Sequence, residues 1–221
     1  MNRLFPSPSE TSEASEAVDL AEAYPPIDVG RPWLVLSMIS SIDGAIAVGE
    51  ASGGLANPGD RAIFRRLRQR SDLVVVGSAT AAAERYRPSP RTDLYIAVVS
   101  ASGKLRLEPE LLVSPQTLVI MPTDAPPVSL RSVRFGTGQA DVAAAIASLR
   151  PRSVLVEGGP SLNGPLLAAG VIDEICMTVA PFTVSGSSPR LATGGPETLQ
   201  PYALAHILEQ DGYLYFRYLR K

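Results

Sequence analysis

The residues best suited to hold an anionic ligand lie in the segment 157–164, which reads Glu-Gly-Gly-Pro-Ser-Leu-Asn-Gly. The apolar run 153–157 predicts a strand before it, and 161–169 predicts a helix after it. The adjacent glycines let the backbone approach a ligand closely, and we expect Ser161 to cap the helix. Free backbone amides at a helix start attract phosphate. The segment is therefore a candidate phosphate-binding turn, with a tight turn that binds nothing as the alternative.

A second glycine turn, Val76-Gly77-Ser78-Ala79-Thr80, follows the predicted strand 73–77 and precedes a short helical run over 80–85. Taken alone, it indicates only close packing of a helix against a strand. Two such turns at the carboxyl ends of strands in one sheet favour a dinucleotide, which has several phosphates to place. We do not interpret Gly136–Gly138 as a third phosphate turn, because the further glycine of the dinucleotide fingerprint is missing.

Arginines gather in residues 61–91, where eight of them stand against two acids. This local excess of positive charge indicates a surface that meets anions. Because a basic stripe with stacking aromatics is lacking, a small phosphorylated ligand is favoured over nucleic acid. In the predicted helix 58–70, Arg61, Arg65 and Arg68 lie on one face, which is either solvated or holds a ligand phosphate.

Two acidic residues are further candidates. Glu157 ends an apolar strand, where an unpaired carboxylate is costly to bury, and hydrogen bonds to a polar ligand would explain its presence. Asp43 lies in the segment 40–44, which leaves the first predicted strand and enters the glycine-rich stretch 49–59. Asp43 either caps a turn or faces the ligand, and 52–54 suits the approach of a flat ring to the backbone.

The rarity of Cys and His excludes several chemistries. The 221 residues include one cysteine, Cys176, and one histidine, His206, so an internal disulfide framework and a Cys/His zinc site are excluded. Cys–His nucleophilic catalysis would need these two residues to meet in space, and we expect His206 to be a packing or surface residue. No apolar run approaches the roughly 20 residues of a membrane span, and the first residues lack the basic region and apolar stretch expected of a secretory signal. We expect a cytoplasmic protein without a bound metal.

Apolar runs alternate with helical patterns from Arg31 onward. The predicted strands are 33–40, 73–77, 94–100, 117–121, 153–157, 173–180 and a hairpin within 203–219 that turns at Asp211-Gly212; the predicted helices are 58–70, 80–85, 139–149 and 161–169. This order predicts a single α/β domain over 29–221, with a mostly parallel central sheet flanked by helices and an antiparallel C-terminal hairpin. Residues 1–28 are acidic and rich in Ser, Glu, Ala and Pro, so we expect a flexible tail.

Five motifs occur in a specific order: SSIDGAIA at 40–47, SGGLANPGDRAIFRRLRQRSD at 52–72, VVVGSAT at 74–80, LVEGGPSLNGPLL at 155–167 and VIDEICMTVAP at 171–181. Together they resemble the riboflavin-pathway reductase domain, the C-terminal domain of bifunctional RibD-type proteins, which has a dihydrofolate-reductase-like fold. The resemblance runs from about Arg31 to the C-terminus and implies a stand-alone member without the deaminase domain. It implies NADPH-dependent reduction of 5-amino-6-(5-phosphoribosylamino)uracil to the ribitylamino product, by hydride transfer to C1′ of the sugar.

Site residues follow from matching positions. NADPH contacts are expected at Ile39, Gly54, Ala56, Gly77, Thr80, Glu84, Gly158, Gly159, Pro160, Ser161, Leu162 and Asn163. Substrate contacts are expected at Ser52, Arg68, Arg91 and Glu157, with an arginine on the 5-phosphate, and Asp43 is a further candidate. Many relatives carry tryptophan at the position of Gly54 and lysine at that of Ser37. No catalytic residue is singled out.

Two other functions remain open. One keeps the fold and NADPH but changes the acceptor to a pterin, such as dihydrofolate, or to the 2,5-diamino form of the pyrimidine. The other is a nucleotide-binding protein that has lost turnover. In each case we expect a small-molecule ligand and neither nucleic acid nor a membrane as a partner. The resemblance further implies a homodimer, for which 173–180 and 203–219 are the candidate interface, although their apolar side chains would equally suit the core.

Overall fold

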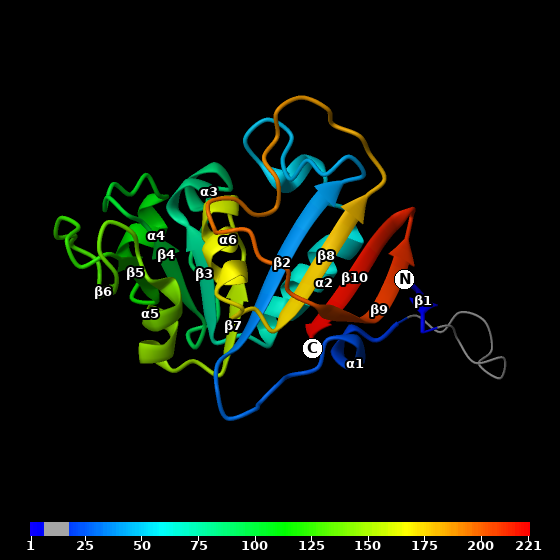
Figure 1. Ribbon diagram of the computed structural model, residues 1–221, viewed down its shortest axis with the longest axis horizontal. Coiled ribbons are helices and arrows are strands. Elements are labelled where there is room, and N and C mark those ends of the chain that lie inside the picture. The colour runs from blue at the N-terminus through cyan, green and yellow to red at the C-terminus, as the bar shows by residue number, and fades with distance from the viewer. Residues whose placement is uncertain (7–17) are drawn as a thin grey trace.

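The computed structural model describes residues 1–6 and 18–221, which form one ten-stranded sheet with helices on both faces (Figure 1). The strands are β1 (Asn2–Phe5), β2 (Trp33–Ser41), β3 (Leu73–Gly77), β4 (Tyr95–Val99), β5 (Thr117–Met121), β6 (Ser132–Arg134), β7 (Ser153–Val156), β8 (Glu174–Ala180), β9 (Tyr202–Gln210) and β10 (Tyr213–Arg220). The helices are α1 (Leu20–Ala23), α2 (Pro58–Gln69), α3 (Ser78–Ala83), α4 (Pro109–Val113), α5 (Val142–Leu149) and α6 (Pro160–Ala168), with a short 3-10 turn at Ser52–Gly54.

The strand order is β1-β9-β10-β8-β2-β7-β3-β4-β5-β6. The strands from β8 to β6 in this order are mutually parallel, whereas β10, β9 and β1 join by antiparallel pairing. The prediction of a mostly parallel sheet with an antiparallel C-terminal hairpin is therefore confirmed. Among the described residues, no helix is both long and apolar enough to cross a membrane.

Local sequence explains the two best-defined turns. Asn57 caps α2, because its side chain accepts the backbone N–H of Asp60 at 2.8 Å, and Pro58 occupies the first helical position, where its missing N–H costs nothing. The β9–β10 hairpin turns at Asp211 and Gly212, both with positive φ (56° and 79°). Such a pair matches the right-handed twist of the flanking strands, as the sequence predicts.

Two hydrophobic cores lie on opposite faces of the sheet. On one face, Val35, Val74 and Leu155 of the sheet pack with Ile63 and Leu67 of α2. On the other face, apolar residues of the same strands pack with α5 and α6, the two helices nearest the viewer in Figure 1. The strands β2, β3 and β7 are buried by both cores, which explains their nearly continuous apolar sequences.

The expectation of a flexible tail over 1–28 is wrong for the parts that the structure describes, and residues 7–17 lie outside them. Strand β1 pairs with β9, and α1 packs beside α2. Tyr24 is fully buried, with its ring edge-on to His206 at 5.0 Å. Composition concealed this docking because the partners, β9 and α2, are far away in the sequence. The expectation that Ser161 caps the following helix is also wrong, since α6 begins at Pro160 with Gly159 as its N-cap.

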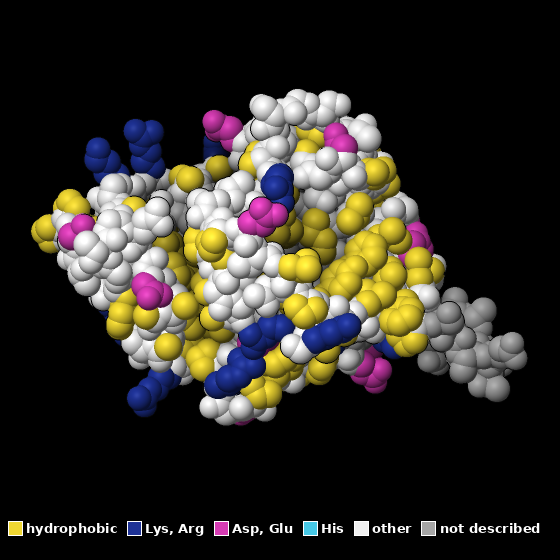
Figure 2. Space-filling model, in the orientation of Figure 1, with side chains coloured by type: hydrophobic (Ala, Val, Ile, Leu, Met, Phe, Trp, Pro, Cys, Tyr) yellow, Lys and Arg dark blue, Asp and Glu magenta, His cyan; other side chains and the backbone are white. Residues whose placement is uncertain are grey.

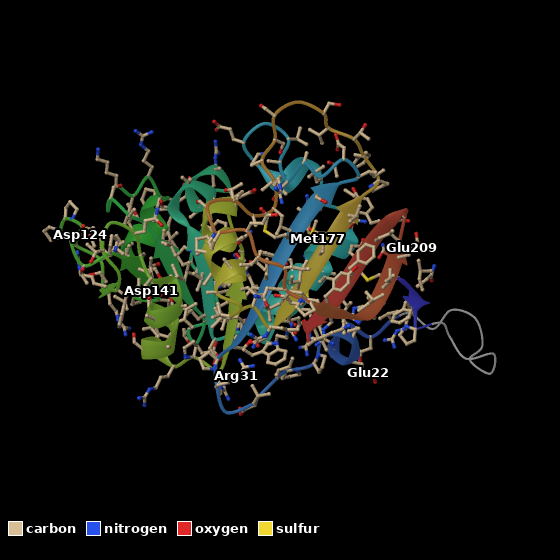
Figure 3. All side chains as sticks on the ribbon, in the orientation of Figure 1. Glu22, Arg31, Asp124, Asp141, Met177 and Glu209 are labelled. Atoms are coloured by element: carbon tan, nitrogen blue, oxygen red, sulfur yellow. The ribbon has the colours of Figure 1, made fainter. Side chains whose placement is uncertain are left out.

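One face of the hairpin region is apolar and has no helix over it in the part of the chain that the structure describes. Its cross-strand rows, taken in the order β8–β10–β9, are Ile175–Tyr218–Leu204, Met177–Phe216–Ile207 and Val179–Leu214–Glu209. Most of these residues are only half-buried. Figure 2 shows a continuous hydrophobic surface there, and Figure 3 places Met177 on it.

Candidate functional site

A cavity of about 560 Å³ opens at the carboxyl end of β2. It is bounded by β2, α2, the starts of α3 and α6, and the loops that follow β2 and α3; the loop after β2 lies at the top of Figure 1. Its lining residues are Ser37, Met38, Ile39, Ile46, Ala47, Glu50, Ser52, Asp60, Arg61, Phe64, Arg68, Thr80, Glu84, Arg85, Tyr86, Arg87, Pro88, Glu157, Gly159, Pro160 and Pro189. Eight residues expected from the sequence line this cavity: Ile39, Ser52, Arg68, Thr80, Glu84, Glu157, Gly159 and Pro160.

The two glycine turns meet because β3 and β7 are adjacent parallel strands that end side by side. The Gly77 N–H donates to the Gly158 carbonyl at 2.7 Å. A Cβ placed on Gly159 would lie 2.6 Å from Thr80 Oγ1, and one on Gly77 would lie 3.4 Å from the Gly159 nitrogen. Gly159 is therefore packed against Thr80 with no room for a side chain, and it lines the cavity.

The start of α6 suits a phosphate-bearing group. Within residues 1–6 and 18–221, neither the Gly159 N–H nor the Ser161 N–H has a hydrogen-bond acceptor. Asn163, fully buried one turn later, donates from Nδ2 to the Leu191 carbonyl at 2.8 Å, and its Oδ1 has no donor in the same part of the chain. The side chain of Leu162 instead belongs to the core cluster that includes residues of α5, and its N–H donates to the Gly159 carbonyl at 2.9 Å, so Leu162 offers no free N–H to a ligand.

Arg68 and Glu157 form a bidentate ion pair in the cavity wall. Nε donates to Oε1 and Nη2 to Oε2, both at 2.7 Å, and the Tyr86 hydroxyl donates to Oε2 at 2.5 Å. The guanidinium lies between two rings, 4.6 Å from the Phe64 centroid and 5.3 Å from that of Tyr86. Burial raises the pKa of Tyr86 well above its usual value, so its hydroxyl remains a neutral donor to the carboxylate.

Other arginines are better placed than Arg68 to bind an anion. Arg61, Arg85 and Arg87 line the cavity with exposed side chains. None of the three forms an ion pair or donates a side-chain hydrogen bond to the described parts of the chain. The Nε and Nη2 of Arg68, by contrast, are already occupied by Glu157. Among these three arginines, Arg61 is the one that the sequence spacing had indicated as a possible phosphate ligand.

The structure places Arg91, expected to contact the substrate, outside the cavity. Its Nη1 donates to the carbonyls of Arg68 and Gln69 at 2.7 and 2.9 Å, and its guanidinium pairs with Asp93. It lies outside the cavity because it binds the carbonyl groups at the end of α2, which have no partner within the helix.

The structure also places Asp43, Gly54 and Ala56 outside the cavity lining. Asp43 accepts the Ser41 hydroxyl and the backbone N–H groups of Val184 and Ser185, and these hydrogen bonds lower its pKa to about 2. In the structure Asp43 joins the turn after β2 to the loop after β8, which favours the structural alternative of the two that the sequence left open. Gly54 lies against Val48, and Ala56 packs on the core.

Ser52 and Glu84 are brought together from distant parts of the sequence. The Ser52 N–H donates to Glu84 Oε1 at 2.6 Å, which joins the glycine-rich loop to the end of α3. Asp60 and Tyr86 line the same cavity and were not found from the sequence. In the sequence, Asp60 has the position of an ordinary acidic residue in the first turn of a helix, and Tyr86 is not part of any recognised motif.

The geometry defines an α/β protein with a cavity at the carboxyl ends of parallel strands, where a glycine turn meets an arginine-rich wall. The family model of the RibD C-terminal domain matches residues 32–210. This chain belongs to that family.

Relatives and solved structures agree with this placement. A 2,5-diamino-6-ribosylamino-4(3H)-pyrimidinone 5′-phosphate reductase of Methanothermobacter thermautotrophicus is 25% identical over 185 residues, which cover 75% of this chain and 85% of that protein. A pyrimidine reductase-like protein of Corynebacterium diphtheriae superimposes with a TM-score of 0.77 at 20% identity, over 93% of this chain and 96% of that one. Dihydrofolate reductase of Enterococcus faecalis, complexed with NADP(H), gives a TM-score of 0.54 at 16% identity over 86% and 96%. The dihydrofolate-reductase-like fold is thereby confirmed.

Proposed function

We propose that this protein is an NADPH-dependent pyrimidine reductase. It would reduce 5-amino-6-(5-phosphoribosylamino)uracil, or the 2,5-diamino counterpart of that compound, to the ribitylamino product. The observation that carries the proposal is one cavity that contains both Gly159, at the start of α6, and the arginine-rich wall of Arg61, Arg85 and Arg87. A dinucleotide and a phosphorylated substrate would meet in that cavity, as hydride transfer between them requires.

The residues at the start of α6 fit the coenzyme. The free amides of Gly159 and Ser161 would bind its pyrophosphate, because N–H groups at a helix start carry partial positive charge. Thr80 and Glu84 border the same space from α3 and its end. NADPH, when bound, supplies the hydride for C1′ of the open-chain sugar. The dihydrofolate reductase that shares the fold is itself complexed with NADP(H).

The substrate would occupy the α2 side of the cavity. Arg61, Arg85 and Arg87 would bind the 5-phosphate, since their guanidinium groups are exposed and uncommitted. The Arg68–Glu157 pair, fixed by Tyr86, would hold the shape of the wall against the sugar. Apolar residues of β2 and the loop after it, Met38, Ile39 and Ile46, would exclude water from the reacting carbon.

Titration of the purified chain with NADPH, followed by an assay at 340 nm with each pyrimidine, tests this proposal. We expect NADPH to bind and to be oxidised only when a phosphoribosylaminopyrimidine is present. Binding without oxidation would favour the non-catalytic alternative, and oxidation with dihydrofolate instead would favour a pterin reductase. Absence of NADPH binding would contradict the proposal altogether.

We further propose that the uncovered face of β8, β10 and β9 pairs with the same face of a second copy. The row centred on Phe216 is apolar throughout, and the row centred on Leu214 is apolar except for Glu209 at its end on β9. A two-fold contact centred on Phe216 would therefore bury apolar side chains of one copy against those of the other. Sedimentation velocity should show a dimer for the intact chain and a monomer for Phe216→Glu. An unchanged sedimentation coefficient for the variant would contradict this interface.

A further inference from the structure

A long connection without helix or strand lies beside the cavity. Residues 181–201 join β8 to β9, and Pro189, within this connection, lines the cavity. Figure 1 shows the connection in orange, first near the loop after β2 and then beside α6. A connection of this length in a compact domain is commonly functional. Neither the coenzyme site nor the phosphate site proposed for this chain accounts for it.

One part of the connection is bound to the turn after β2. The N–H groups of Val184 and Ser185 donate to the Asp43 carboxylate at 3.1 and 2.8 Å. Ser188 Oγ accepts the N–H of Ile46, a residue that lines the cavity, at 3.2 Å. This part of the connection is therefore attached to the cavity wall that β2 and its following loop form.

The next part is bound to the first turns of α6. The Thr193 N–H donates to the Pro160 carbonyl at 3.0 Å, and Asn163 Nδ2 donates to the Leu191 carbonyl at 2.8 Å. Asn163 is fully buried and is not among the residues that line the cavity. Its side-chain nitrogen thus binds the backbone of the connection, which passes from one wall of the cavity to the other.

Two glycines let the connection lie directly on α6. A Cβ on Gly195 would lie 2.6 Å from the Gly164 carbonyl oxygen, and a Cβ on Gly164 would meet the backbone of Thr193. Neither glycine has a positive φ. The missing side chains therefore serve the close approach of two backbones and not a turn. A side chain at either position would push the connection away from the helix.

We propose that Asn163 is a positioning residue for the coenzyme site. It holds residues 182–195, which we call the strap, against α6, and NADPH bound at the start of α6 stabilises that contact. This inference rests on the proposed function, because it needs the coenzyme at the amides of Gly159 and Ser161. Pro160, whose carbonyl binds the strap, lies between these amides, so a coenzyme that fixes this turn also fixes the strap. By linkage, loss of the strap contact weakens coenzyme binding.

Trypsin measures the strap contact directly, because the exposed Arg190 precedes Leu191 within the strap. The Leu191 carbonyl is bound to α6, so this peptide bond becomes a substrate only when the strap leaves the helix, and its cleavage rate follows the open fraction. We expect saturating NADPH to slow the cleavage at least about fivefold, because it binds the closed form better. NADPH that binds in calorimetry without slowing this cleavage would overturn the inference.

Two variants disrupt the contact from opposite sides. Gly195→Ala places a Cβ against the Gly164 carbonyl, and Asn163→Asp replaces the donor to the Leu191 carbonyl by an acceptor. Each should speed cleavage of the ligand-free strap at least about tenfold and weaken NADPH binding about threefold or more. Ser187→Ala, at an exposed strap position without a side-chain hydrogen bond in residues 1–6 and 18–221, is the matched control and should match the unaltered chain.

Cleavage after Arg65 separates this positioning role from general destabilisation. Arg65 lies within α2, so its peptide bond is cut only when that helix unfolds. The two variants should leave this rate unchanged. Equal acceleration after Arg65 and Arg190, with unchanged NADPH affinity, would show a purely structural contact and overturn the inference. If one variant does not fold, the other variant and the protection of the unaltered chain by NADPH decide.

The outcomes also separate the strap from the proposed function. Protection of the strap by NADPH, without oxidation of NADPH by any pyrimidine, would overturn the reductase and keep the inference. Oxidation of NADPH with a pyrimidine, without protection of the strap, would keep the reductase and overturn the inference. Absence of NADPH binding would overturn both.

Discussion

The guanidinium of Arg68 and the carboxylate of Glu157 are joined by two parallel hydrogen bonds of 2.7 Å, across 89 residues of sequence. The side chain of Glu157 is only 2% exposed and that of Arg68 26%. The pair therefore ties α2 to the end of β7 inside the cavity wall. Its two members act as one structural unit, in which Nη1 of Arg68 is the guanidinium nitrogen left without an acceptor in the described residues.

Removal of the Arg68 side chain should destabilise the cavity wall more than it weakens the binding of a phosphate group. Arg68→Ala leaves Glu157 buried without its main partner, which we expect to cost about 2–3 kcal/mol of unfolding free energy and to lower turnover of every acceptor. Arg87→Ala, which breaks no ion pair within residues 1–6 and 18–221, should reduce kcat/KM only for phosphorylated substrates. Urea unfolding and assays with and without the 5-phosphate would measure both effects. A loss confined to phosphorylated substrates in Arg68→Ala would show that Arg68 binds the phosphate.

Gly159 should tolerate no side chain. Its φ of −83° suits any residue, but a Cβ would lie 2.6 Å from Thr80 Oγ1. We expect Gly159→Ala to weaken NADPH binding by at least about tenfold in calorimetry, because the loop must shift away from α3 and the amides shift with it. Thr80→Ala in the same chain removes the clashing atom and should restore part of the affinity. Unchanged binding in Gly159→Ala would place the coenzyme elsewhere.

His206 should make stability depend on pH. Burial, with the charges of Arg217 and Arg3, lowers the pKa of this histidine to about 4. The unfolded chain, with an ordinary histidine pKa of about 6.5, binds the proton first, so stability is fully present above pH 6.5 and is lost as the pH falls toward 4. Urea unfolding should lose about 2 kcal/mol from this group between pH 7 and pH 5. The His206→Gln variant should lose correspondingly less unfolding free energy between pH 7 and pH 5. Equal losses in the two proteins would contradict the attribution of this pH dependence to His206.

Tyr24 should be a major stabilising contact of the N-terminal segment. It is fully buried between α2 and the hairpin, and Arg66 Nε donates to its carbonyl at 3.1 Å. Tyr24→Ala should cost about 3–5 kcal/mol, as for other large aromatic residues deleted from a core. Thermal melting should show a fall of roughly 6–20 °C, since 1 kcal/mol shifts a domain of this size by about 2–4 °C. Val29→Ala, at an exposed position, serves as the control and should melt within about 2 °C of the unaltered chain.

The sequence alone was sufficient to predict those helices, strands and turns that depend on interactions between neighbouring residues. Asn57 and Pro58 predicted the start of α2, and Asp211-Gly212 predicted the hairpin, because both depend on neighbouring residues. The strands 73–77 and 117–121 were predicted with their observed bounds, since buried parallel strands have continuous apolar sequences. Strand β1 was missed because its pairing with β9 spans about two hundred residues, and because its four residues begin a segment that is acidic and rich in Ser, Glu, Ala and Pro.

The site was only partly predictable for the same reason. Glycine turns can be recognised from the sequence alone, so Gly77 and Gly159 were predicted. The structure brings the two turns together. Arginine side chains are long, and spacing alone does not show which acid or carbonyl each one reaches. In the structure Arg91 binds carbonyl groups at the end of α2, and Arg68 is engaged by Glu157.

Both outermost strands of the sheet are short, four residues in β1 and three in β6. Each therefore offers few free backbone groups to the strand of another molecule. Filament growth by strand addition is disfavoured at either margin, even though the sheet is ten strands wide. Self-association should accordingly be finite in size and reversible, without progression to fibrils.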